Sequence, residues 1–158
     1  MINKFLLPNK FKIIGWIVFI PATVLGVILT TTGFEIDWLN AKVFAIFSDG
    51  AIGKSQKFGF METNITNTVI GVLFIVGAML VGFSKEKKED EFIANLRLSS
   101  LLWAVAVNYI LLFFAFLFVY GTPFLTVMVY NMFTVLILFI ARFNYILYRN
   151  AKTTPDEK

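Results

Sequence analysis

Residues 98 to 141 read LSSLLWAVAVNYILLFFAFLFVYGTPFLTVMVYNMFTVLILFIA, which is two apolar runs separated by Gly121, Thr122 and Pro123. Neither run contains a charged residue, and each is close to the roughly 20 residues that a helix needs to cross about 30 Å of hydrocarbon. Glycine and proline between two such runs mark a tight turn. The stretch therefore predicts two membrane-spanning helices that lie side by side as an antiparallel hairpin.

Two more uncharged apolar runs, at about 13–30 and 65–83, precede this hairpin. Hydrophobic residues make up 58% of the chain and charged residues 15%, whereas soluble domains have about 45–50% and about 25%. We therefore expect an all-α membrane protein with four transmembrane helices in a single domain, residues 1–148. The expected helices cover about 13–31, 65–83, 90–120 and 124–148, and residues 149–158 are expected to form a disordered cytoplasmic tail.

The 14 Lys and Arg residues are distributed unevenly around the four runs. Lys42, Lys54 and Lys57 lie between the first and second runs, and all the others lie before the first run, between the second and third, or at and after the end of the fourth. Cytoplasmic loops of membrane proteins carry an excess of such residues. The pattern predicts an inner-membrane protein that has both termini in the cytoplasm.

The segment of about 32–64 is the only sizeable piece expected outside the membrane. Residues 42–47 and 57–63 have strand-like composition and flank the turn signal Ser48-Asp49-Gly50, which favours a small β-hairpin. An interfacial amphipathic helix that uses Ile36, Leu39, Val43 and Phe47 is the alternative. In both cases Trp38, Phe44 and Phe60 are expected at the level of the lipid headgroups.

Several kinds of chemistry are disfavoured by composition. The chain has no cysteine and no histidine, so it lacks the usual ligands of haem, zinc and copper and the commonest general base near neutral pH. No cofactor, no metal site and no catalytic residue is expected. The basic residues stand at the ends of apolar runs instead of interleaving with aromatic residues, so nucleic-acid binding is not expected either.

All the carboxylates lie outside the four apolar runs, whereas ion transporters generally place an ionisable group within the bilayer. Arg142, at the end of the fourth run, and Arg97, before the third, are interpreted with Trp38 as membrane-interface anchors. The charged stretch of residues 84–91 is expected to be a solvated cytoplasmic loop. In the second run, Ala78 and Gly82 form a small-xxx-small pair that we expect to serve packing within the protein.

Amide and hydroxyl groups inside the third and fourth runs are the best candidates for a site. Asn108, Tyr109, Asn131 and Thr134 are interpreted as helix–helix contacts, with a small polar pocket or a contact face for a partner's helix as the alternative. If the hairpin turns at about Thr122, Asn108 lies level with Leu136, within a turn of Thr134. Ser99 or Ser100 then lies level with Asn144.

Four sequence blocks, from Ser84 to Glu91, from Leu96 to Leu98, from Leu102 to Ala104, and Asn108-Tyr109, resemble a stretch found in small, uncharacterised bacterial membrane proteins. The similarity extends to Tyr130-Asn131-Met132 and to the residues from Arg142 to Tyr145. It implies a four-helix inner-membrane protein and carries no activity, cofactor or site residue with it.

Three functional hypotheses follow. The first is a non-enzymatic accessory, regulatory or signalling component that acts through contacts with a membrane-protein partner or with further copies of itself. The alternative is a small oligomeric transporter or channel for a neutral or lipophilic solute, with Asn108 and Asn131 facing the path. A lipid-modifying enzyme that uses Glu35, Asp37 and Glu62 as acids on the outer face is the third.

Overall fold

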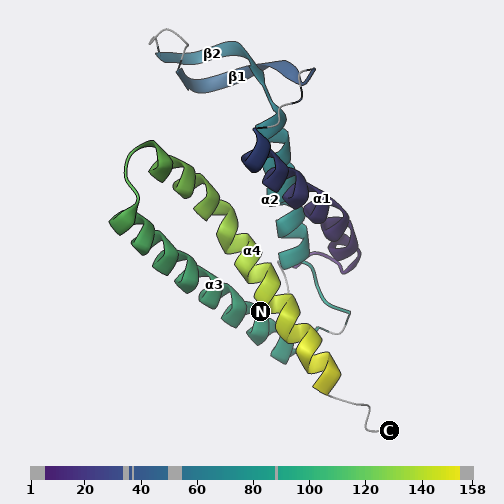
Figure 1. Cartoon of the computed structure of the whole chain (residues 1–158). Coiled ribbons are helices and arrows are strands. Elements are labelled where there is room, and N and C mark those ends of the chain that lie inside the picture. The colour runs from purple at the N-terminus through teal and green to yellow at the C-terminus, as the bar shows by residue number, and fades with distance from the viewer. Residues whose placement is uncertain (1–5, 34–35, 37, 50–54, 88, 154–158) are drawn as a thin grey trace. The chain divides into compact units, whose positions relative to one another are not determined.

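The computed structural model describes residues 6–33, 36, 38–49, 55–87 and 89–153, which form four helices and one β-hairpin (Figure 1). In chain order the elements are α1 (Lys10–Thr32), β1 (Asn40–Asp49), β2 (Ser55–Asn64), α2 (Thr66–Gly82), α3 (Glu91–Phe118) and α4 (Thr122–Thr153). Three helices are long and apolar enough to cross a membrane, namely α1, α3 and the part of α4 from Thr122 to Asn150. The helix α2 is also apolar but is shorter, with 17 residues.

Most helix boundaries agree with the sequence prediction, and the differences have local causes. The helix α4 begins at Thr122, earlier than expected, because Pro123 stands in the first turn, where a missing backbone N–H removes no helical hydrogen bond. Gly121 has φ 74°, a left-handed conformation that glycine adopts without strain, and it separates α3 from α4. The prediction that the tail is disordered from residue 149 is wrong for residues 149–153, which continue α4, and residues 154–158 lie outside the described part of the chain.

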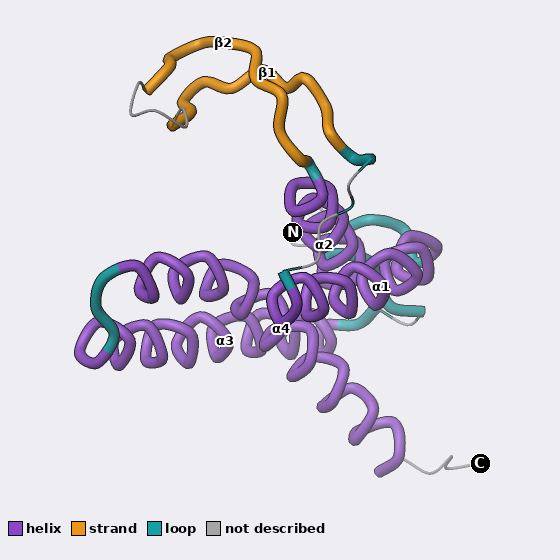
Figure 2. The backbone as a smooth tube through the Cα atoms, turned by 45° about the horizontal axis from the view of Figure 1, so that its top comes forward, coloured by secondary structure: helices purple, strands orange, loops and turns teal. Residues whose placement is uncertain are grey.

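The chain divides into two compact units, Met1–Phe19 with Ile75–Lys158, and Ile20–Phe74. In the first unit α3 and α4 run antiparallel and side by side, joined by the turn at Gly121 (Figures 1 and 2). Its core consists of side chains from α2, α3 and α4 that are almost inaccessible to solvent: Ala78, Val81, Ala104, Phe139, Ile140 and Phe143. The predicted hairpin of the last two helices is confirmed.

Glycines allow the start of α1 and the end of α2 to touch within the first unit. A Cβ atom added to Gly15 would lie 2.8 Å from the backbone nitrogen of Val81, and one added to Gly77 would lie 2.8 Å from the backbone nitrogen of Phe19. The ring of Phe139 lies over Gly82, 2.6 Å from the position of such an atom. The expectation that Ala78 and Gly82 serve packing within the protein is confirmed, because Ala78 is buried and Gly82 receives this ring.

The second unit contains the hairpin of β1 and β2. The strands are antiparallel and in register from Asn40 opposite Asn64 to Asp49 opposite Ser55. Of the two alternatives for this segment, the β-hairpin is therefore confirmed and the amphipathic helix is wrong. The alternation of side chains in β1 allows cross-strand pairs such as Phe44 with Phe60, whereas a helix would leave the aromatic residues of β2 without these partners.

Candidate functional site

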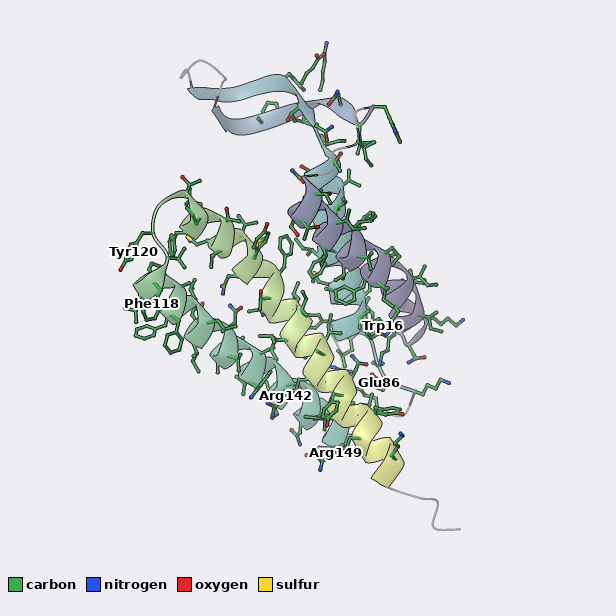
Figure 3. All side chains as sticks on the ribbon, in the orientation of Figure 1. Trp16, Glu86, Phe118, Tyr120, Arg142 and Arg149 are labelled. Carbon is green, nitrogen blue, oxygen red and sulfur yellow. The ribbon has the colours of Figure 1, made fainter. Side chains whose placement is uncertain are left out.

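Charged residues from the ends of three helices gather with an aromatic ring of α4 in the first unit. We call this group the helix-end cluster, and it consists of Lys12 in α1, Glu86 and Glu89 in the segment after α2, Arg97 in α3 and Phe143 in α4. Figure 3 labels Glu86 there, and it also labels Arg142 and Arg149 on the same half of α4, away from Tyr120 at the turn. The cluster joins segments that lie far apart in the sequence.

Arg97 is the centre of the cluster. Its Nη1 donates to Oε1 of Glu89 at 2.7 Å, and its Nη2 donates to Oε2 of Glu89 at 3.3 Å and to the backbone oxygen of Ser84 at 3.1 Å. The guanidinium lies over the ring of Phe143, 5.1 Å from its centroid. Two parallel bonds to one carboxylate are the geometry that a planar guanidinium favours. Arg97 therefore connects the end of α2 and the start of α3 to α4.

The N-terminal segment is attached to the same region. Lys12 forms an ion pair with Glu86 and also lies over the ring of Phe143, at 5.9 Å from its centroid. Two backbone hydrogen bonds hold Leu7 beside the end of α2. The N–H of Leu7 donates to the backbone oxygen of Phe83, and the backbone oxygen of Leu7 accepts from the N–H of Lys85. These contacts link residues more than 70 positions apart, and no local pattern in the sequence predicts them.

The segment from Ser84 to Asp90 is shaped by its own side chains. Asp90 caps α3 by accepting a hydrogen bond from the backbone N–H of Ile93 at 2.8 Å. An N-cap carboxylate satisfies one of the free N–H groups of a helix start and suits its positive end. Glu89 also accepts from the backbone N–H of Glu86 at 2.8 Å, which closes a short loop and turns its carboxylate toward Arg97.

The expectation of a solvated charged loop is wrong for Glu86 and Glu89. Their side chains are 12% and 9% exposed, and the side chains of Lys12 and Arg97 are 13% and 8% exposed. Arg97, expected as an interface anchor, is held inside the protein. Each buried charge is paired with one of opposite sign, because desolvation of an unpaired charge is costly.

Arg142 is held by an aromatic ring rather than by a carboxylate in the described part of the chain. Its guanidinium lies over the ring of Trp103, 4.5 Å from the centroid. Three buried polar atoms in this part of the first unit have no hydrogen-bond partner among the described residues, namely Nε of Arg97, Nε of Arg142 and Oγ of Ser100. The stack on Trp103 nevertheless agrees with a position at the end of a span, where an arginine stem packs along apolar surface.

The two central amides of α3 and α4 are bonded to each other. Nδ2 of Asn108 donates to Oδ1 of Asn131 at 2.9 Å, and Nδ2 of Asn131 lies 3.2 Å from Oδ1 of Asn108 and 3.4 Å from its backbone oxygen. Asn108 is buried and Asn131 is partly exposed. The prediction that Asn108 lies at the same depth as Leu136 is wrong, because the turn between the helices is centred near Tyr120 and not at Thr122.

The other candidates of these two helices do not join the amide pair. Thr134 donates to the backbone oxygen of Tyr130 one turn earlier, at 2.9 Å, and Tyr109 is 65% exposed. Asn144 donates to the backbone oxygen of Ile140 at 2.8 Å, so it is not paired with Ser100 across the hairpin. The structure thus brings together Asn108 and Asn131 and leaves Tyr109 and Thr134 apart from them.

On the hairpin side, Trp38 is 81% exposed and Glu62 pairs with Lys42 at 3.4 Å. Glu35 and Asp37, the other acids considered for an outer-face enzyme, lie outside the described residues. Within the described ranges, no group of three His, Cys, Asp or Glu side chains is arranged to hold a metal ion. In comparisons with known proteins, no family model, curated protein or solved structure matches this chain.

Proposed function

We propose that this chain is a four-pass inner-membrane protein with both termini in the cytoplasm, and that it acts through contacts with membrane proteins rather than by catalysis. In this proposal α2 is a span in addition to α1, α3 and α4. It has 17 residues, near the lower limit of about 17–25 residues for a spanning helix, and the apolar Ile65 and Phe83 flank it. The uneven distribution of Lys and Arg supports the orientation.

The helix-end cluster supports the same orientation. The start of α1, the segment after α2 and the start of α3 all carry basic residues, and Lys12, Lys85 and Arg97 lie in the same part of the first unit. If α1 and α2 both cross the membrane, the start of α1, the end of α2 and the start of α3 lie on the same side. The positive-inside rule predicts that this side is the cytoplasm. The cluster itself is a structural joint, since its charges neutralise each other.

The observation that carries the proposal of a protein partner is the partial exposure of Asn131. This amide lies among apolar residues of α4, and its neighbours Tyr130 and Met132 are 43% and 57% exposed. Asn108 bonds this amide within the protein, but part of its polar surface stays exposed, and exposed polar surface is unfavourable against acyl chains. A helix of a partner, from another membrane protein or a second copy of this chain, would cover the part of the amide that stays exposed.

A photoreactive amino acid placed at single positions tests the contact in native membranes. At Tyr130 we expect irradiation to form a discrete protein adduct, identified by mass spectrometry as a second copy or as another membrane protein. Ile110 is the matched control, because it is 56% exposed on α3 and lies at a similar distance from the turn. Adducts with lipid alone at Tyr130, or the same protein adduct at both positions, would contradict the proposed partner face.

A further inference from the structure

The hairpin of β1 and β2 presents an aromatic pair on an exposed face. Phe44 lies directly opposite Phe60, and their rings meet edge to face with centroids 5.4 Å apart. The two side chains are 57% and 76% exposed. Edge-to-face contact stabilises a cross-strand pair, but it leaves most of both rings uncovered.

The same face carries an ion pair, and residues of β1 on the opposite face are less exposed. Lys42 and Glu62, one pleat away from the aromatic pair, face each other at 3.4 Å. Alternation along the strands places Ala41, Val43 and Ala45 on the other side, and these are less exposed than Phe44. Two large aromatic rings are therefore on an exposed face, where they are available to a further surface.

The hairpin is attached to the start of α2 by a short and well-bonded joint. Nδ2 of Asn64 donates to the backbone oxygen of Ile36 at 2.9 Å, and its Oδ1 accepts from the backbone N–H of Thr66 at 2.9 Å. The hydroxyl of Thr66 accepts from the N–H of Ile36 at 3.1 Å, and Thr66 is 1% exposed. These bonds restrain the direction of the strands, which turn aside from the axis of α2 (Figures 1 and 2).

The joint limits how far the aromatic face can be from the end of the helix. Phe60 is six positions before Thr66, the first residue of α2. At about 3.3 Å per residue in a strand, Phe60 lies no more than about 20 Å from that end. A two-stranded hairpin alone is marginally stable in water, so a surface that covers one face would stabilise it.

From these observations we propose that the face formed by Phe44 and Phe60 lies in the membrane–water interface of the leaflet in which α2 begins, and that the exposed Trp38 lies in the same interface. The inference rests on the proposed membrane span of α2. Aromatic residues are enriched at this depth because their rings are buried at the boundary of headgroups and acyl chains. Lys42 and Glu62 neutralise each other, so burial of the rings rather than attraction to anionic lipid holds the hairpin on a zwitterionic surface.

Tryptophan quenching by brominated lipid tests the proposal on the full chain in phosphatidylcholine vesicles. The natural Trp16, Trp38 and Trp103 are replaced by Phe, and a single tryptophan is introduced as Phe44→Trp. The matched control is Val43→Trp, one residue away on the opposite face of the strand. A third variant retains only the natural Trp16 in α1, and far-UV circular dichroism verifies that all three have the same secondary structure.

We expect lipids brominated high on the acyl chain to remove most of the fluorescence of Phe44→Trp and much less of that of Val43→Trp, with no change in high salt. Equal quenching of the two variants, or quenching of neither while Trp16 is quenched, would overturn the inference and leave the membrane embedding intact. A hairpin face covered by protein gives this second result. Loss of quenching at Trp16 as well would instead contradict the proposed membrane protein itself.

Discussion

Asn108 of α3 and Asn131 of α4 face each other as a reciprocal amide pair, with Nδ2 of Asn108 2.9 Å from Oδ1 of Asn131. The reverse contact, from Nδ2 of Asn131 to Oδ1 of Asn108, is 3.2 Å. Each amide thus serves as donor and acceptor within a largely apolar helix hairpin. Sliding one helix along the other would leave both side chains without this partner, so the pair defines the register of α3 against α4.

Asn108→Ala is expected to lower the free energy of unfolding by about 0.5–2 kcal/mol, because it removes the pair and leaves the amide of Asn131 without its partner. Reversible unfolding in mixed micelles, followed by circular dichroism, measures the change. Ser100→Ala is the control, since Ser100 is equally buried on α3 and its Oγ has no hydrogen-bond partner among the described residues. Similar losses in both variants would show that burial alone, and not the amide pair, stabilises the hairpin.

Arg97→Met is expected to lower the free energy of unfolding by about 3–5 kcal/mol, because it leaves the buried carboxylate of Glu89 unpaired. The double variant Arg97→Met/Glu89→Leu removes both charges and should recover a large part of this loss. The same unfolding measurement on wild type, single and double variants checks the expectation. A single variant as stable as the wild type would contradict the burial of this ion pair.

Gly77→Ala is expected to destabilise the protein by about 1–3 kcal/mol, because the added methyl group would meet the backbone of Phe19 and force α1 and α2 apart. Gly26→Ala is the matched control in α1, since its added methyl group would lie 3.8 Å from Ile70, an ordinary contact. Thermal unfolding in detergent compares the two variants. If the two variants have the same melting temperature, α1 and α2 do not approach as closely as the structure indicates.

The proposed orientation can be tested with single cysteines, because the natural chain contains none. Lys87→Cys, after α2, and Thr122→Cys, at the turn between α3 and α4, are at exposed positions. A membrane-impermeant maleimide added to spheroplasts is expected to label Thr122→Cys at once and Lys87→Cys only after lysis. Labelling of Lys87→Cys in intact spheroplasts would reverse the proposed topology.

Much of the helical architecture could be predicted from the sequence because uncharged apolar runs of this length have few stable alternatives in lipid. The runs that became α1, α3 and α4, the turn at Gly121 and the presence of two strands between α1 and α2 were visible as local patterns, but the turn predicted at Ser48-Asp49-Gly50 was wrong for Ser48 and Asp49, which are paired within β1. The helix ends were less accurate, since they depend on single capping residues. Asp90 sets the start of α3 because its side chain caps the helix, and Pro123 allows α4 to begin at Thr122 because its ring suits the first turn.

The candidate site was predictable only in part. Asn108 and Asn131 stood out as amides in apolar runs, but their pairing depends on where α3 ends, and the turn centre near Tyr120 decided it. The burial of Glu86 and Glu89 could not be foreseen, because charged residues in a loop are solvated unless distant residues supply partners. Here those partners are Lys12 and Arg97.

Local hydrophobicity and charge were thus sufficient to determine that the chain forms apolar helices, and they favoured a small hairpin between the first two, since both are properties of short segments. Only the tertiary structure decided which polar groups are paired. The attachment of Leu7 and Lys12 to the end of α2 and the stacking of Arg97 on Phe143 involve residues that are remote in sequence. Such contacts form where backbones approach closely enough, and that approach is set by packing at Gly15, Gly77 and Gly82.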